Sequence, residues 1–198
     1  MNNSTPNPFR EMQFTVSAPN LSAFPAEDRV ETAFAGRSNA GKSSALNAIC
    51  QRRKLARTSK TPGRTQAINF FEHGDIRFAD LPGYGFARVP PAMKAAWQAL
   101  VEGYLAQRAN LRGVVLVMDV RRPLTDFDRQ LLDWGGAGDL AFHLLLTKAD
   151  KLSRNRQMSA LLSVQRAVHP HTAQLFSATQ HIGIAEARSH ISAWLAAA

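Results

Sequence analysis

Apolar runs and amphipathic segments alternate along this chain of 198 residues. Short, nearly continuous apolar runs predict buried strands, and stretches with apolar residues at helical spacing predict helices. The apolar runs predict strands at residues 13–18, 31–35, 67–73, 75–80, 113–119, 141–147 and 172–177. The helical spacing predicts helices at residues 42–52, 91–109, 125–135, 153–168 and 183–197. This alternation is typical of a three-layer α/β domain with a mostly parallel sheet.

Two of the expected strands, 67–73 and 75–80, are joined by His73-Gly74-Asp75. A connection this short cannot cross over a sheet, so it predicts a hairpin. We therefore expect one antiparallel strand, at the edge of the otherwise parallel sheet. The polar, proline-containing start of the chain predicts a flexible end over residues 1–12, and the remaining length predicts a single domain over residues 13–198.

The stretch Gly36 to Ser44, GRSNAGKSS, lies between the expected strand 31–35 and the expected helix 42–52. It has the spacing G-x-x-x-x-G-K-[ST], in the strand, turn and helix context that this pattern requires. Gly36 and Gly41 let the backbone bend so that consecutive N–H groups and the helix start face one anion. Lys42 can reach the outer phosphates and Ser43 can offer a hydroxyl to Mg²⁺, so the stretch predicts a nucleoside triphosphate site.

Two later segments are expected beside the terminal phosphate. Asp80-Leu81-Pro82-Gly83 ends the strand 75–80, where an aspartate sits beside the metal and a glycine N–H can sense the γ-phosphate. The stretch 58–66, TSKTPGRTQ, lacks apolar periodicity and predicts a flexible loop able to close over a phosphate. Thr65 is the expected metal hydroxyl in this loop, and Thr61 is the alternative. Each segment also has an ordinary interpretation, as a plain turn and an exposed connector.

Two segments near the C-terminal end are expected around a base. The strand 141–147 delivers Thr147-Lys148-Ala149-Asp150. A carboxylate there can accept both the N1–H and the exocyclic amine of guanine, a donor pair that adenine lacks, while the lysine stem can cover the base. Backbone N–H groups of Ser177-Ala178-Thr179 can contact the guanine carbonyl. Each segment alone is equally an ordinary helix cap, but their order after the phosphate loop predicts guanine.

Composition adds the class of protein and of partner. Hydrophobic residues at 45% and charged residues at 20% are ordinary for a globular domain, and the single Cys50 cannot form an internal disulfide, which suits a cytoplasmic protein. The longest apolar run is far too short to span a bilayer, so we expect no membrane insertion. The net charge of +9 and the pI near 10.6 favour a nucleic-acid partner; a generally basic, solvated surface is the alternative.

Basic residues cluster before the flexible loop, in a run without acidic residues: Arg52, Arg53, Lys54, Arg57, Lys60 and Arg64. We interpret the run as an RNA-binding face that the loop presents when it orders with GTP; a solvated helix end is the alternative. Arg121 and Arg122 either extend this face or pair with Asp126 and Asp128. The histidines, His143 included, lack metal spacing and are expected to be structural, and Trp97, Trp134 and Trp194 are expected to pack in or near the core.

The ordered set GRSNAGKS, TPGRT, DLPG, TKAD and SAT resembles the five motifs of translation-factor-type GTPases. More closely, TSKTPGRTQ, DLPGYGFA, DVRRPLTDFD and TKADKL resemble the EngB (YihA, YsxC) family of small bacterial GTPases, within the TrmE-Era-EngA-EngB-Septin-like superfamily. The resemblance covers the chain from about Phe14 to Leu195. It implies one Ras-like G domain of the P-loop NTPase fold that binds GTP and GDP with Mg²⁺. It also implies a cytoplasmic, monomeric, slow GTPase that acts with the large ribosomal subunit and its rRNA during assembly, and that is required for normal cell division and septation.

The resemblance also implies roles for individual residues. The expected metal ligands are Ser43, Thr65 and Asp80, and the expected catalytic residues are Lys42, Thr65 and Asn39. The nucleotide-binding set is Gly36, Arg37, Ser38, Asn39, Ala40, Gly41, Lys42, Ser43, Gly63, Arg64, Thr65, Asp80, Leu81, Pro82, Gly83, Thr147, Lys148, Ala149, Asp150, Phe176, Ser177 and Ala178.

One departure from Ras-type proteins bears on hydrolysis. The residue after the DLPG glycine is Tyr84, not a glutamine that can orient the attacking water. Hydrolysis is therefore expected to be feeble unless another group supplies charge. Asn39 is the candidate, either by binding K⁺ beside the phosphates or only by stabilising the turn. Two functions remain open: a GTP-hydrolysing switch, and a nucleotide-gated rRNA-binding module with negligible intrinsic hydrolysis. A P-loop ATPase or kinase is disfavoured because Asp150 selects guanine.

Overall fold

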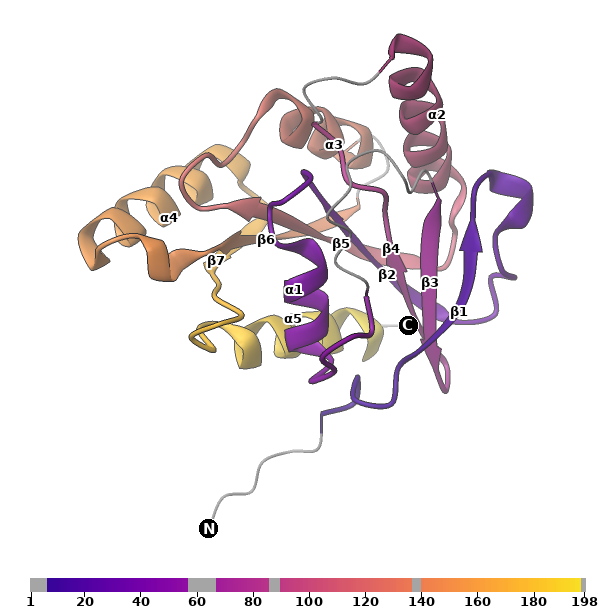
Figure 1. Ribbon diagram of the computed structural model, residues 1–198, viewed down its shortest axis with the longest axis horizontal. Coiled ribbons are helices and arrows are strands. Elements are labelled where there is room, and N and C mark those ends of the chain that lie inside the picture. Colours follow the sequence, from indigo (N-terminus) through magenta and orange to yellow (C-terminus); the bar gives the residue numbers. More distant parts are fainter. Residues whose placement is uncertain (1–6, 57–66, 86–89, 137–139, 197–198) are drawn as a thin grey trace.

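A seven-stranded sheet in the order β1-β3-β4-β2-β5-β6-β7 forms the centre of the protein (Figure 1). The computed structural model describes residues 7–56, 67–85, 90–136 and 140–196. The strands are β1 (Gln13–Ala18), β2 (Val30–Gly36), β3 (Ile68–His73), β4 (Ile76–Asp80), β5 (Leu111–Asp119), β6 (Ala141–Thr147) and β7 (Thr172–Leu175). The helices are α1 (Lys42–Ile49), α2 (Pro91–Gln107), α3 (Asp126–Gly136), α4 (Arg154–Val168) and α5 (Ile184–Ala196), with single 3₁₀ turns at Leu21–Ala23 and Ala149–Lys151.

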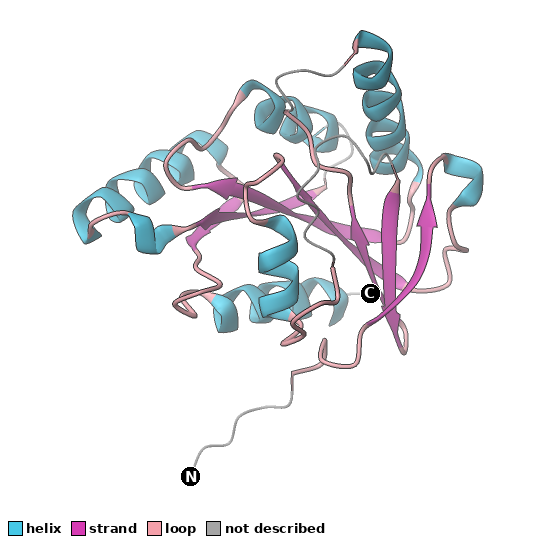
Figure 2. Cartoon of the chain, in the orientation of Figure 1, coloured by secondary structure: helices cyan, strands magenta, loops and turns pink. Residues whose placement is uncertain are grey.

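The helices cover the sheet on both faces, as the alternating pattern predicted (Figure 2). Apolar residues of α2, α3 and α4 pack in one core cluster with one face of the sheet, whereas those of α1 and α5 pack in a second cluster with the other face. The three-layer α/β prediction is confirmed. Because β2 and β5 lie at the centre and are buried on both faces, their residues 33–36 and 113–118 are all apolar or glycine, which explains why they read as continuous runs.

The single antiparallel strand is confirmed, but its expected place at the edge of the sheet is wrong. β3 runs antiparallel to β4, as the short turn requires, and it also pairs antiparallel with β1. β1 therefore forms the edge, and β3 lies one strand inside it. The hairpin fixed the direction of β3 locally, whereas the pairing of β1 with β3 joins segments about fifty residues apart in sequence.

The start of the domain also differs from the expected flexible end over residues 1–12. Phe9 and Met12 are fully buried, and the Phe9 ring lies 5.0 Å from the Phe78 ring of β4. The Asn7 side chain donates to the carbonyl of Ile49 at the end of α1. Residues 7–12 therefore pack against the α1 and α5 face, because two large apolar side chains in this short segment gain more from burial than the segment loses in freedom.

Helix α1 is held at its C-terminal end. It ends at Ile49, three residues before the predicted end, and Gln51 adopts a positive φ of 54° that closes the helix. Arg188 of α5 donates to the carbonyl oxygens of Ala48 and Ile49 at 3.0 and 2.7 Å, which satisfies acceptors at the helix end. This contact fixes the helix whose start carries the phosphate loop.

A buried ionic cluster ties the opposite end of the sheet together. Glu31 of β2 is fully buried and accepts hydrogen bonds from Tyr104 at 2.5 Å and from Arg108 Nη2 at 2.6 Å. Arg77 of β4 lies 3.6 Å from the same carboxylate. Since Glu31 has these partners, its burial is compensated, and α2 is anchored to the sheet. Among the described residues, no helix has the length and apolarity required to cross a membrane.

Candidate functional site

The phosphate loop, residues 36–43, connects the end of β2 to the start of α1 at the carboxyl edge of the parallel strands. A Cβ on Gly36 would lie 2.5 Å from the carbonyl oxygen of Val117, so only glycine fits beside β5. Gly41 has a φ of 100°, which a residue with a side chain rarely adopts. The loop places backbone N–H groups at the N-terminus of α1, where an anion is favoured.

Asn39 lies at the outer turn of this loop. Its φ of 63° is in the left-handed region, which asparagine tolerates better than most residues with side chains. The backbone thus accounts for an asparagine at this position, in agreement with the turn-stabilising alternative. The potassium role stays a prediction.

Lys42 and Asp80 meet at the phosphate end of the site. The Lys42 ammonium donates to Asp80 Oδ1, and both side chains are about one-tenth exposed. Asp80 is the last residue of β4, so β4 and the start of α1 bring together the predicted phosphate lysine and the predicted metal aspartate. The carboxylate of Asp80 and the hydroxyl of Ser43 are the oxygen ligands that Mg²⁺ prefers, so the donor set fits this metal.

The segment after Asp80 is attached to the phosphate loop through its backbone. The Ser38 N–H donates to the carbonyl of Tyr84 at 2.8 Å, and Arg37 and Tyr84 form a parallel bridge. Leu81 N–H donates to the carbonyl of Phe34 in β2 at 2.9 Å. The predicted residues Leu81, Pro82 and Gly83 therefore lie beside the phosphate loop, as the sequence order suggested.

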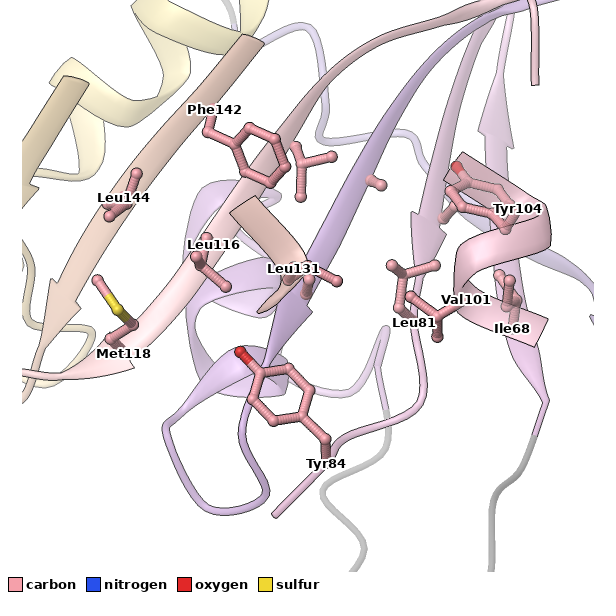
Figure 3. Close-up of a cluster of buried hydrophobic side chains, with 14 of the residues drawn as sticks. Ile68, Leu81, Tyr84, Val101, Tyr104, Leu116, Met118, Leu131, Phe142 and Leu144 are labelled. Atoms are coloured by element: carbon pink, nitrogen blue, oxygen red, sulfur yellow. The ribbon is translucent and has the colours of Figure 1, made fainter. Parts of the chain in front are cut away.

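The side chain of Tyr84 points into the core between the sheet and α3 (Figure 3). Its ring centroid lies 5.4 Å from that of Trp97 and 5.8 Å from that of Phe127. The hydroxyl donates to Asp128 Oδ1, and burial raises the pKa of Tyr84 well above its ordinary value. Tyr84 thus stays protonated and cannot occupy the place of a water-orienting glutamine in this conformation.

The base end of the site is organised around Asp150. Ser177 Oγ donates to Asp150 Oδ1 at 2.6 Å, and Lys151 Nζ lies 3.3 Å from Oδ2. The Ser177 hydrogen bond, with a smaller effect from Lys151, holds the pKa of Asp150 below its usual value although partial desolvation acts against it. Ala149 N–H donates to the carbonyl of Phe176 at 3.1 Å, which places Phe176, Ser177 and Ala178 next to the Thr147 to Asp150 segment.

Two residues of this segment connect the base end to the phosphate loop. Thr147 Oγ1 is hydrogen-bonded to the carbonyl oxygens of Ala40 and Met118. Lys148 Nζ donates to the carbonyl of Asn39 at 2.7 Å and so lies along the outer side of the loop. The segment expected to bind the base is therefore hydrogen-bonded directly to the loop expected to bind the phosphates.

Asp119, at the end of β5, was not among the predicted site residues, yet it lies beside Lys148. Lys148 Nζ is 3.0 Å from Asp119 Oδ2. Arg121 donates to the same carboxylate through Nε at 2.9 Å and Nη2 at 2.6 Å. Of the two alternatives for Arg121, its pairing with Asp126 and Asp128 is wrong, because Asp119 is two residues away and accepts from Nε and Nη2. Only the family-specific stretch DVRRPLTDFD marked this region in the sequence, and it gave no partner.

Asp128 instead joins the loop before α3 to Tyr84. Its Oδ2 accepts hydrogen bonds from the backbone N–H and the hydroxyl of Thr125, both at 2.7 Å, and its Oδ1 accepts the Tyr84 hydroxyl. No periodic or motif feature of the sequence indicates this tertiary contact.

A cavity of about 520 Å³ opens beside the phosphate loop and the end of β5. It is lined by Arg37, Ser38, Asn39, Ala40, Met118, Asp119, Arg121, Arg122, Asp128 and Lys148. Three predicted residues, Gly63, Arg64 and Thr65, lie outside the described part of the chain, as do Thr61 and two cations of the basic run, Arg57 and Lys60. Arg52, Arg53 and Lys54 are described and exposed.

Comparison with known proteins identifies the kind of domain. Residues 31–148 match the family model described as "50S ribosome-binding GTPase". The chain is 46% identical over 199 aligned residues to the "Probable GTP-binding protein EngB" of Paraburkholderia xenovorans (strain LB400), and the alignment covers 93% of this chain and 92% of the relative.

Solved structures agree on the fold. The crystal structure of a probable GTP-binding protein engB superimposes with a TM-score of 0.70 at 21% identity, covering 85% of this chain and all of that one. The elongation factor SelB of Methanococcus maripaludis, solved with the GTP analogue GPPNHP, gives a TM-score of 0.61 at 11% identity over 85% of this chain and 34% of its own. At these identities the likeness shows the G-domain fold alone.

Proposed function

The chain belongs to the EngB family of GTP-binding proteins, and from this we propose that it is a slow, Mg²⁺-dependent switch in assembly of the large ribosomal subunit. We further propose that it is required for normal cell division and septation, and that it works as a monomer in the cytoplasm. The membership itself makes the protein a P-loop GTPase.

The proposal that the protein binds a guanine nucleotide rests on one observation: hydrogen bonds join the phosphate end of the site to the base end. Lys42 and Asp80 lie together at the phosphate end, and Asp150 is oriented by Ser177 at the base end. Thr147 and Lys148 join both ends through the carbonyls of Ala40 and Asn39. One ligand with a triphosphate and a guanine base matches this arrangement.

In this proposal the loop 36–43 holds the phosphates, with Lys42 neutralising the outer ones. Ser43, Asp80 and Thr65 would hold Mg²⁺, which supplies positive charge against the charge that develops on the phosphates. Asp150 would accept two guanine hydrogens, and the segment 176–178 would close over the base. Gly63, Arg64 and Thr65 of the stretch 58–66 would complete the phosphate end of the site.

The ribosomal part of the proposal is supported by charge. Arg52, Arg53 and Lys54 are exposed after α1, and the net charge of the chain is +9. Positive surface charge binds RNA by displacing counterions, so the binding should weaken steeply with salt. The name of the matching family model, a 50S ribosome-binding GTPase, points to the same partner.

The decisive experiment is co-sedimentation with purified ribosomal subunits, with a GTP analogue or GDP, over a salt series. We expect retention on the large subunit with the analogue, little with GDP, and a steep loss with salt. Equal retention in both nucleotide states would contradict the switch. A variant in which Arg52, Arg53 and Lys54 are all replaced by glutamine should bind the nucleotide normally and sediment less.

The alternative function, a nucleotide-gated rRNA-binding module with negligible intrinsic hydrolysis, is favoured by one observation. Tyr84 replaces the water-orienting glutamine, and its hydroxyl is engaged by Asp128. Steady-state GTP turnover with and without large subunits separates the two functions. A rate that rises strongly on the particle supports the switch, and a rate near the uncatalysed one in both conditions supports the module.

A further inference from the structure

The carboxylate of Asp119 accepts hydrogen bonds from two cations, Arg121 and Lys148. Oδ1 accepts from Arg121 Nε at 2.9 Å and from the Arg121 backbone N–H at 3.0 Å. Oδ2 accepts from both Arg121 Nη2 at 2.6 Å and Lys148 Nζ at 3.0 Å. The Arg121 hydrogen bond, followed by that of Lys148, holds the pKa of Asp119 far below its usual value, so the group stays ionised. Arg121 and Lys148 therefore share one oxygen and its negative charge.

Arg121 is open to solvent, while the Lys148 ammonium reaches the carbonyl of Asn39 in the phosphate loop. The Arg121 side chain is 51% exposed, whereas the Asp119 side chain is 20% exposed. Arg37, Arg121 and Arg122 are all exposed and line the cavity beside the phosphate loop. An incoming anion thus reaches Arg121 without first displacing Asp119.

The charge of this cavity suits a phosphate. Its cationic lining is Arg37, Arg121, Arg122 and Lys148, and its acidic lining is Asp119 and Asp128. Asp128 is buried and already accepts from Tyr84 and Thr125, which leaves Asp119 as the accessible carboxylate. Arginine guanidinium groups bind phosphate oxygens with two parallel hydrogen bonds, the same geometry that Arg121 now uses on Asp119.

We propose that Arg121, with Arg37 and Arg122 beside it, binds a backbone phosphate of RNA, and that Asp119 is the positioning residue that transmits this event to Lys148. The inference rests on the proposed guanine-nucleotide site and adds a place where RNA acts on it. When a phosphate takes the Arg121 guanidinium, Asp119 Oδ2 is left to Lys148 alone. Lys148 is then held more firmly along the phosphate loop, and the nucleotide leaves more slowly.

Thermodynamic linkage gives a second consequence. If RNA slows loss of the nucleotide by strengthening its binding, the nucleotide must strengthen RNA binding by the same factor. GDP and GTP share the guanine base that the segment carrying Lys148 is proposed to bind, so the coupling should be the same for both nucleotides. The coupling through Asp119 thus makes RNA bind more tightly to the nucleotide-bound protein than to the nucleotide-free protein. Any difference in RNA binding between the GTP and GDP states must come from the phosphate end of the site.

The test measures the release of radiolabelled GDP, chased with unlabelled GDP, with and without a saturating short single-stranded RNA. In the unmodified protein we expect RNA to slow release by roughly twofold to fivefold, the upper part of the range for a partly exposed charge pair. Arg121→Gln should release GDP about as slowly without RNA as the unmodified protein does with it, and RNA should change its rate no further. Asp119→Asn should release GDP faster and also lose the response.

The matched control is Arg129→Gln, which removes the same charge from an exposed residue of α3 that does not line the cavity. It should keep both the basal release rate and the RNA response. If Arg121 only stabilised the fold, Arg121→Gln would speed release instead of slowing it, and that result would overturn the proposal. Thermal unfolding of each variant checks that the folded state is intact.

The inference and the proposed function fail in different ways. If the unmodified protein binds no GDP, the guanine-nucleotide site itself is wrong and the coupling through Asp119 falls with it. If GDP binds tightly and RNA binds without changing the rate of GDP release, the guanine-nucleotide site is supported and the coupling through Asp119 is wrong.

Discussion

The hydroxyl of Tyr84 donates a hydrogen bond to the buried carboxylate of Asp128, which joins the segment after Asp80 to the first turn of α3. The same Tyr84 binds the phosphate loop through its carbonyl, which accepts from Ser38 N–H. A single residue thus connects the loop to the α2 and α3 side of the core. If the segment after Asp80 moves during a nucleotide cycle, the contacts of Tyr84 with Asp128 and with Ser38 must either break or move with it.

The first prediction concerns this contact. Asp128→Asn weakens the hydrogen bonds from Tyr84 and Thr125 and should lower the free energy of unfolding by about 2 kcal/mol, as measured by urea denaturation. Asp126→Asn is the control, because Asp126 is exposed in the same helix turn and both changes remove a similar helix-dipole interaction. Tyr84→Phe should cost a similar amount and be non-additive with Asp128→Asn. Additive losses would show that the two groups do not interact.

The second prediction tests base selection. Asp150→Asn should weaken GDP binding on the order of 100-fold and favour xanthosine nucleotides, since the amide presents a donor where guanine also has one. Isothermal titration calorimetry with GDP and XDP measures both effects. Ser177→Ala is the control: it removes the hydroxyl that orients Asp150, so it should weaken binding by about tenfold without changing the preferred base. Retained preference for guanine in Asp150→Asn would remove the basis for a guanine site.

The third prediction tests the metal role of Asp80. In the unmodified protein, removal of Mg²⁺ with EDTA should weaken GTP binding, because the phosphate charge loses its main counter-charge. Asp80→Asn should abolish most of the difference between Mg²⁺ and EDTA. Asp75→Asn, an exposed change of the same charge in the turn before β4, should keep it. An undiminished Mg²⁺ effect in Asp80→Asn would place the metal elsewhere.

The fourth prediction separates the two roles of Asn39. Glycine accepts the φ of 63° at this position without the side chain, so Asn39→Gly preserves the turn and deletes a potential ion ligand. If the side chain binds K⁺, the unmodified protein should hydrolyse GTP faster in potassium than in sodium, and Asn39→Gly should show the sodium rate in both. If Asn39 serves only the turn, exchange of the two salts should leave both proteins unaffected.

The fifth prediction concerns acid stability. His143 of β6 is buried against Gln174 and Thr172 and stacks on His190, and burial lowers its pKa from 6.5 to about 4. The unfolded chain therefore binds more protons than the folded one between these two values, so stability should fall as the pH drops from 6.5 toward 4. The loss should approach about 3 kcal/mol. Burial also lowers the pKa of His171, which acts in the same direction.

Urea denaturation at several pH values between 7.5 and 4.5 measures this dependence. His143→Gln lacks the titrating ring and should show a shallower decline, whereas His181→Gln, at an exposed turn position, should follow the unmodified protein. Equal slopes in the three proteins would show that His143 does not control the acid response.

The elements and the ends of the site could be predicted because their signals are local. Each strand or helix is encoded by its own hydrophobic period, and predicted and observed bounds differ by a few residues at most. The phosphate loop could also be predicted, because its two glycines are required by the local backbone. Gly36 is required by the close approach of Val117, and Gly41 by its positive φ. The order of the motifs placed them at one edge of the sheet, because parallel strands end there.

The partners of these residues depended on the tertiary structure. The edge position of β1, the burial of Phe9 and Met12, and the contacts of Asp119 with Lys148 and of Tyr84 with Asp128 all join segments distant in sequence. A period or motif specifies which way a side chain faces, but not which of several carboxylates it meets. That choice follows from how the layers pack: the sequence of this protein determined its strands, helices and nucleotide-binding motifs, and only the folded chain decided which charges they share.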